Sequence, residues 1–527
     1  MPSASRIAAL VSTAALSLAA CGGSGGASSP VAVDAKPACT AAASVSLAVG
    51  ETAALTAEQA RCFSLAAGSN AEYALAGFDG RALEASRAGQ ATGGFSAPEY
   101  TVADATSGGP AQSVSAAPRQ PAAQALPAHV RYNAAAADVG ANSPFARTTP
   151  WREGERFTVA PLEGTEPATA RVVRVVGGRF VLAVVEKDEA AARKVLEQST
   201  EALEFLAARG VPLLQSTFKA GVPSTSAGSG QLLILATAWD PSRGAAATWT
   251  REDGNGASSF VWLNTNLRGG MGEGFEMYDH ASYRIKVLGH ELTHAWQASW
   301  LRAEHGHAAP AAADWSIEGG ADFVAMDLVR RFLNVGVASN WKWSENLEPR
   351  RESVVFALEP FGAQGRLTWG YYDASSLLRD LQARLMAGGL SAEAAMAEVS
   401  RGAVEGWHGT DGDGGACAGL VERLRPRLGS GWDAAGAVLL WTATQAADDR
   451  TSNPVLNNPT YYDVGNADGR YGWKAAAEVR AGSGERATVS QVAGGSFYVR
   501  LRGSSTAGVV SASSSTPDAR WMIARVR

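Results

Sequence analysis

The sequence predicts a multidomain α+β protein, with a mainly helical C-terminal half of the central domain and small all-β domains flanking it. Three observations support this class. The chain has 527 residues, which is more than one hydrophobic core usually organises. Apolar and polar residues alternate near both ends, which is typical of strands. Between about residues 281 and 446, apolar residues instead recur at helical spacing.

The N-terminal segment has the pattern of an export signal. Arg6 precedes an apolar run from Ile7 to Ala20, which is too short for a membrane-spanning helix and ends at Cys21. Residues 18–21 read Leu-Ala-Ala-Cys and resemble a bacterial lipobox, in which the cysteine is lipidated after cleavage. A Gly/Ser-rich stretch follows, as expected of a tether. The alternative is an ordinary secretory signal with a coincidental cysteine.

This resemblance implies a lipoprotein of the bacterial cell envelope. Residues 1–21 would be the signal peptide and residues 22–37 the tether, with the membrane reached through lipid on Cys21. Gly22 stands where an aspartate usually causes retention in the inner membrane, so the outer membrane is the expected location, facing the periplasm or the surface.

Residues 38–104 are predicted to form a β-sandwich-like domain, because alternating segments are separated by Gly, Asn and Asp. In an exported protein, Cys39 and Cys62 are expected to form a disulfide. Residues 105–150 are rich in Ala, Pro, Ser and Gly and are predicted to be a linker. Alternation returns in residues 447–527, which are predicted to form a C-terminal β-rich domain.

Residues 151–446 are predicted to form the central domain. The pair Gly177-Gly178 lies between two β-branched runs and predicts a hairpin. A helix is predicted from Glu189 to Ala208, ending at Gly210. Strands are then predicted at Leu232–Ala236 and Ser259–Leu263. Further helices are predicted over residues 281–304, 314–334, 369–387, 391–400 and 417–446.

A metal-binding motif lies in the first helix of this last group. Residues 290–294 read His-Glu-Leu-Thr-His. Residues four apart on a helix share one face, so His290 and His294 can bind one ion. Glu291 can then take a proton from a water that the ion activates. The chain has only 7 histidines, so two of them falling in this motif argues against a coincidental match.

A third ligand is predicted on the next helix. Glu318 and Asp322 are four apart in the stretch Trp-Ser-Ile-Glu-Gly-Gly-Ala-Asp. Glu318 would complete a His₂Glu site with one position open for water, as in catalytic zinc sites. Asp322 can accept a hydrogen bond from the free ring nitrogen of a ligand histidine, which fixes its tautomer. The alternative for Glu318 is a solvated acid in the first turn of a helix.

The two motifs together resemble the gluzincin metallopeptidases, which include thermolysin-like and aminopeptidase N-like enzymes. The resemblance covers roughly residues 230–390 and implies a zincin-type catalytic domain. It implies Zn²⁺ bound by His290, His294 and Glu318, with Glu291 as the base and Asp322 orienting a ligand. The lipobox with an N-terminal β-domain is also similar to secreted hyicolysin-like peptidases.

The resemblance also suggests residues that would contact the substrate. Tyr371 and Tyr372 are placed like the catalytic tyrosine of the family, which donates to the developing oxyanion. His408 is an alternative donor, and packing tyrosines are a second alternative. Asn264 and Thr265 end a segment where gluzincins have an edge strand that pairs with the substrate backbone. An ordinary sheet strand is the alternative there.

These features predict an exported zinc-dependent endopeptidase that acts on a protein or peptide. Residues 270–273 read Gly-Met-Gly-Glu and lack the Asn of the GxMEN exopeptidase motif, but an aminopeptidase remains an alternative. A non-catalytic surface-binding lipoprotein with a vestigial site is another. The net charge is −5 and no basic stripe is present, so no nucleic-acid partner is expected.

Overall fold

The structure is a computed structural model that describes part of the chain. The described residues are residue 39 and the ranges 43–68, 70–81, 98–105, 111–115, 130–132, 143–160, 167–226, 229–239, 245–253, 256–265, 280–306, 315–334, 359–361, 366–368, 371–407, 413–429, 431–446, 475–491 and 495–527. Cys21, His307 and His408 lie outside them.

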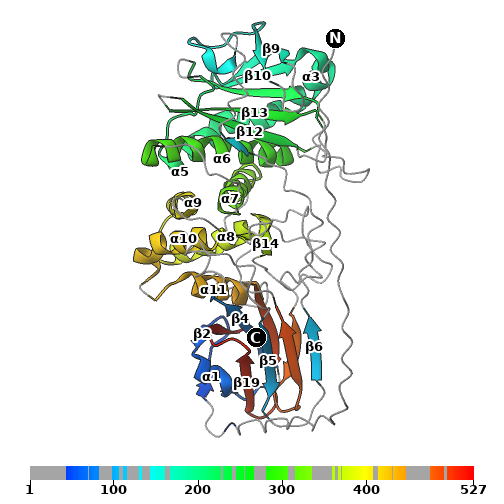
Figure 1. The fold of residues 1–527 in the computed structure, drawn as a ribbon, viewed down its shortest axis with the longest axis vertical. Helices are drawn as coiled ribbons and strands as arrows, with labels where there is room; N and C mark the ends of the chain where they lie inside the picture. The colour runs from blue at the N-terminus through cyan, green and yellow to red at the C-terminus, as the bar shows by residue number, and fades with distance from the viewer. Residues whose placement is uncertain are drawn as a thin grey trace, which may run out of the picture. The chain divides into compact units, whose positions relative to one another are not determined.

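Strands from both ends of the sequence form two sheets that share one hydrophobic core. The strands are β1 (Ala43–Val45), β2 (Thr52–Leu55), β3 (Phe63–Leu65), β4 (Glu72–Asp79), β5 (Glu99–Asp104), β6 (Ala111–Ser115), β16 (Ala477–Arg480), β17 (Arg486–Ser490), β18 (Ser496–Arg502), β19 (Gly508–Ser514) and β20 (Ala519–Arg525). The six-stranded sheet has the order β1-β3-β19-β5-β17-β6, and the five-stranded sheet has the order β16-β18-β4-β20-β2. Blue N-terminal strands therefore lie beside red C-terminal strands (Figure 1).

This sandwich differs from the two separate β-domains that the sequence predicts. β4 pairs with β18 on one side and β20 on the other, and β5 likewise lies between β17 and β19. β6, in the predicted linker, pairs with β17. Residues 38–104 and 447–527 therefore contribute to one domain. Alternation identifies a strand but does not identify its neighbours, which accounts for the difference.

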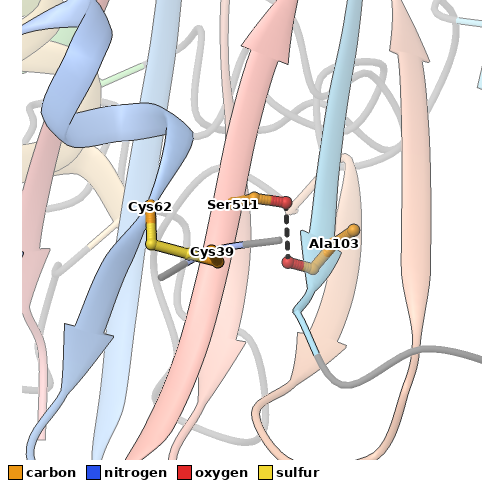
Figure 2. The surroundings of a disulfide bond; sticks show 4 residues. All are labelled: Cys39, Cys62, Ala103 and Ser511. Carbon is orange, nitrogen blue, oxygen red and sulfur yellow. Dashed lines mark hydrogen bonds between the residues drawn. A yellow bond between two sulfur atoms is a disulfide. The ribbon is translucent and has the colours of Figure 1, made fainter. Parts of the chain in front are cut away.

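The predicted disulfide between Cys39 and Cys62 is present, with the two Cα atoms 5.6 Å apart. Cys62 directly follows the short helix α1 (Ala57–Arg61). Figure 2 shows the bridge together with a contact between two sandwich strands, in which the Ser511 hydroxyl donates to the Ala103 carbonyl at 3.5 Å. The bridge links the residue before β3 to a residue preceding β1.

A seven-stranded sheet forms the first part of the central domain. Its strands are β7 (Val130–Tyr132), β8 (Arg156–Val159), β9 (Ala168–Val176), β10 (Phe180–Val185), β11 (Leu232–Thr237), β12 (Ala246–Asp253) and β13 (Gly256–Asn264), in the order β7-β12-β13-β11-β10-β9-β8. The expectation of an edge strand before the metal-binding motif is wrong, because β13 lies between β12 and β11. β7 comes from the predicted linker and pairs with β12.

The predicted hairpin is confirmed, since β9 and β10 are antiparallel and Gly177 and Gly178 have φ of 57° and 66°. The predicted helix after it is longer than expected. It continues as α3 (Glu189–Gln198), α4 (Thr200–Phe205), a π turn (Leu206–Gly210) and α5 (Val211–Phe218). Gly210 has an ordinary helical φ of −68°, so it does not end the helix.

The remaining helices follow the predicted order. They are α6 (Ala281–His305), α7 (Trp315–Phe332), α8 (Tyr371–Ala387), α9 (Ala392–Trp407), α10 (Asp413–Leu428) and α11 (Ala434–Ala446), with a short hairpin of β14 (Glu359–Phe361) and β15 (Arg366–Thr368) before α8. The helix predicted over residues 417–446 is two helices, because Gly429 has a φ of 110°. Within the described ranges, no helix has both the length and the apolarity of a membrane span.

Helix α6 packs on β12 and β13 with one face and on α7 with another (Figure 1). Gly289 allows the second contact, because a Cβ there would lie 2.9 Å from Cδ1 of Leu328 on α7. The metal-binding motif therefore lies between a sheet and a helix. This mixed arrangement agrees with the predicted multidomain α+β class.

Candidate metal centre

Helix α6 places two histidine rings side by side. The ring centroids of His290 and His294 are 4.7 Å apart, and the two Nε2 atoms are 3.0 Å apart. His294 is fully buried, whereas 13% of the His290 side chain is exposed. The spacing of four residues in the sequence therefore gives the shared face that the motif predicts.

Helix α7 brings a carboxylate to the same point. Glu318 lies in the first turn of α7, and its Oε2 is 3.0 Å from Nε2 of His290 and 3.3 Å from Nε2 of His294. Its Oε1 is buried and has no hydrogen-bond partner among the described residues. These three side chains form a group that can hold a metal ion.

The outer nitrogens of both rings face acceptors. Nδ1 of His294 is 2.8 Å from Oε1 of Gln297, and Nδ1 of His290 is 3.5 Å from Oδ1 of Asp322. A neutral imidazole carries one N–H, so donation from Nδ1 leaves a lone pair on each Nε2. Two lone pairs and a carboxylate oxygen then converge on one point, and a cation at that point relieves their repulsion.

The close contact between these rings and carboxylates also shifts their pKa values when no metal is bound. Burial lowers the pKa of His290, but the hydrogen bonds that its ring donates to Asp322 and Glu318, and the charges of Glu318 and Glu291, raise that pKa to about 10. Burial raises the pKa of Glu318, yet the charges and hydrogen bonds of His294 and His290 lower it well below its usual range. The raised pKa of His290 therefore favours a protonated ring, paired with the carboxylates around it, in the metal-free site.

Glu291 is 3% exposed, and its carboxylate contacts the sheet. The hydroxyl of Thr248 on β12 lies 2.7 Å from its Oε2 and 2.9 Å from the Glu291 main-chain carbonyl. Thr248 is fully buried. Glu291, which follows His290 directly in the sequence, is therefore held against the sheet and largely shielded from water.

Asp322 links the metal centre to a buried lysine. Its Oδ1 is 3.7 Å from Nζ of Lys286, which lies one turn before His290 on α6. The two side chains are 1% and 8% exposed, respectively. A buried carboxylate needs a compensating charge to stay ionised, and Lys286 supplies one. Asp322 is thus available as an acceptor for His290, as predicted.

The other predicted site residues have different contacts or lie outside the described side chains. Asn264 is fully buried, and its Nδ2 donates to the main-chain carbonyl of Trp239 at 3.4 Å. The main-chain nitrogen of Thr265 donates to the Thr237 carbonyl at 2.9 Å. Tyr371 and Tyr372 begin α8, but their side chains lie outside the described part of the chain. Their roles as substrate and oxyanion contacts remain predictions.

Three residues with contacts at this site are not part of the sequence motifs: Thr248, Lys286 and Gln297. Gln297 follows the candidate ligand His294 by three residues, and Lys286 precedes the candidate ligand His290 by four. A polar residue at either spacing shares the ligand's face of the helix, so this signal was present in the sequence. Thr248 lies on a different strand, and no local spacing indicates it.

Comparison with known proteins does not assign a family or a function to this site. No protein-family model matches the chain, and no curated protein matches it.

Proposed function

We propose that the chain is a zinc-dependent peptidase. The observation that carries this proposal is the convergence of His290, His294 and Glu318 beside a buried carboxylate, Glu291. Tetrahedral zinc with ligands at roughly 2.0–2.2 Å requires ligand atoms about 3.4 Å apart. The three distances here, 3.0, 3.0 and 3.3 Å, are close to that value.

The donor set also suits zinc. Two imidazole nitrogens and one carboxylate oxygen are the ligands of a catalytic His₂Glu site, which leaves a fourth position open. Calcium and magnesium prefer oxygen ligands, so two nitrogens disfavour them. The gluzincin family and its zincin-type domain are part of this proposal, because both motifs of that family coincide with the contacting residues.

The residues around the site support hydrolysis of an amide bond. Zinc would supply Lewis acidity that lowers the pKa of a water in the open position towards about 7. Glu291 accepts a proton from the attacking water and returns it to the nitrogen of the leaving group. Asp322 and Gln297 hold the tautomers of the two histidines throughout. Tyr371, Tyr372 or His408 would donate to the developing oxyanion.

The test is metal analysis of the purified protein together with proteolysis of casein, with and without a chelator. We expect about one zinc per chain and chelator-sensitive cleavage. Peptides with blocked and free N-termini then separate an endopeptidase from an aminopeptidase, and we expect cleavage of both. Zinc binding without cleavage of any peptide would instead support a binding lipoprotein with a vestigial site.

The cellular location is a further part of the proposal. The lipobox-like residues at 18–21 support attachment of the chain to the bacterial envelope through lipid on Cys21. In that compartment an oxidising environment is consistent with the disulfide between Cys39 and Cys62.

A further inference from the structure

One face of the seven-stranded sheet packs on α6, and this face is mainly apolar around β12 and β13. Ala246, Val261 and Leu263 on this face belong to the main hydrophobic core. Thr248 and Thr250 alternate with Ala247 and Trp249, which belong to a separate core on the opposite face.

The two threonines on this face have different partners. The Thr250 hydroxyl lies 2.9 Å from the Ser259 hydroxyl on β13, so it joins two neighbouring strands. The Thr248 hydroxyl instead reaches across to α6 and contacts Glu291. A buried hydroxyl costs free energy unless it is hydrogen-bonded, and Thr248 satisfies that requirement through the proposed catalytic base.

One hydroxyl hydrogen serves two possible acceptors here, the Oε2 and the main-chain oxygen of Glu291. Hydrogen bonds to an ionised carboxylate are shorter and stronger than those to a neutral carbonyl. The distance of 2.7 Å to Oε2, against 2.9 Å to the carbonyl, follows this order. Among the described residues, Thr248 is the hydrogen-bond partner of the Glu291 carboxylate.

We propose that Thr248 is a positioning residue for the reaction, and this inference rests on the proposed function. Its hydroxyl binds Oε2 of Glu291 and fixes the carboxylate to the rigid sheet, so that the other oxygen keeps one orientation towards the reacting water. A displacement of about 1 Å in a catalytic group can cost 10²-fold in rate. Thr248 therefore contributes to turnover and not to binding of substrate or metal.

The experiment compares Thr248→Val with Thr250→Val in the full-length, zinc-loaded protein. Valine has nearly the same shape as threonine but cannot donate a hydrogen bond. Both variants lose one buried hydroxyl from the same face of the same strand, so both are expected to unfold at a lower temperature. Only Thr248→Val should lower kcat, by about 10- to 100-fold, with KM and zinc affinity unchanged.

Two further measurements separate positioning from general destabilisation. Thr248→Ser retains the hydroxyl and should restore kcat. A hydroxamate inhibitor chelates zinc and shares a proton with a neighbouring carboxylate. Its dissociation constant, measured by calorimetry, should therefore rise in Thr248→Val and Glu291→Gln but not in Thr250→Val. If Thr248→Val does not fold, Thr248→Cys is similar in size and a weak donor, and gives the same comparison.

Equal kcat in wild type and Thr248→Val would overturn the inference, as would an equal fall in Thr250→Val. A wild-type protein that binds no zinc and cleaves no peptide would overturn the proposed function instead. The two failures are therefore distinguishable.

Discussion

Gln297 contacts His294 at 2.8 Å through its side-chain oxygen, while its side-chain nitrogen donates to the Ile317 carbonyl at 3.0 Å. Ile317 directly precedes the third proposed ligand. One amide therefore orients a ligand on α6 and fixes the position of the ligand on α7. This bridge joins the two helices that carry the three proposed ligand atoms.

Replacing this amide should weaken metal binding. Gln297→Met keeps most of the volume but loses both hydrogen bonds, so we expect zinc affinity to fall about 10- to 100-fold. Competition with a chromophoric chelator measures this. Gln382→Met is the control, since Gln382 is also buried and its hydrogen bonds join it to Arg379 and Ala392 and not to a proposed ligand. The control should lower stability without changing zinc affinity. An equal loss of zinc affinity in Gln297→Met and Gln382→Met would contradict the proposed role of Gln297.

The base is tested by Glu291→Gln. Glutamine is nearly isosteric but cannot take a proton, so proteolysis should be lost while zinc content stays near that of wild type. Atomic absorption and a casein assay on the same sample measure both. Full activity in this variant would show that Glu291 is not the base.

The third ligand is tested by Glu318→Ala. Catalytic zinc requires a third protein ligand beside the two histidines, so zinc occupancy should fall and proteolysis should be abolished. The control is the double variant His305→Ala with His307→Ala, because these histidines follow the motif more closely in sequence. It should retain both properties. Zinc lost from the double variant and kept in Glu318→Ala would reverse the assignment.

The metal-free protein should lose stability as pH rises. The pKa of His290 is raised from 6.5 to about 10 in the folded chain. A raised pKa stabilises the folded state fully below 6.5, and this contribution disappears as pH rises towards 10. Zinc-loaded protein would not share this loss, because bound zinc would keep Nε2 of His290 unprotonated.

Thermal unfolding from pH 6 to pH 10 measures this difference, using chelator-treated and zinc-loaded samples. The gap in Tm between the two should widen with pH. Chelator-treated His290→Asn, which lacks the titrating ring, serves as the control and should show a flatter profile. An identical profile for chelator-treated wild type and this variant would contradict the prediction.

The anchor is tested by Cys21→Ser. If lipid on Cys21 holds the protein at the membrane, this variant should move to the soluble fraction after cell lysis. The proteolytic activity of the released protein should be unchanged. Wild-type amounts of Cys21→Ser in the membrane fraction would exclude the lipobox interpretation.

The sequence predicted local features better than distant ones. The ligand motif and the helices were predictable because spacings of three and four residues determine which side chains share a helix face. The contact between Thr248 and Glu291 could not be predicted in this way, since it joins a strand to a helix 43 residues later in the sequence. The shared sandwich was missed for the same reason: the hydrogen bond between Glu99 and Ser515 spans 416 residues.

This interleaving of strands affects how the chain can fold during synthesis. β4 and β5 are translated long before β17, β18, β19 and β20, which flank them in the finished sheets. A nascent chain must therefore carry unpaired strands while the whole central domain is made, and such edges invite aggregation. A product that terminates before β18 lacks both neighbours of β4. Premature termination thus yields a chain that cannot complete its sandwich. Chaperones and degradative proteases would bind the unpaired strands of such a chain.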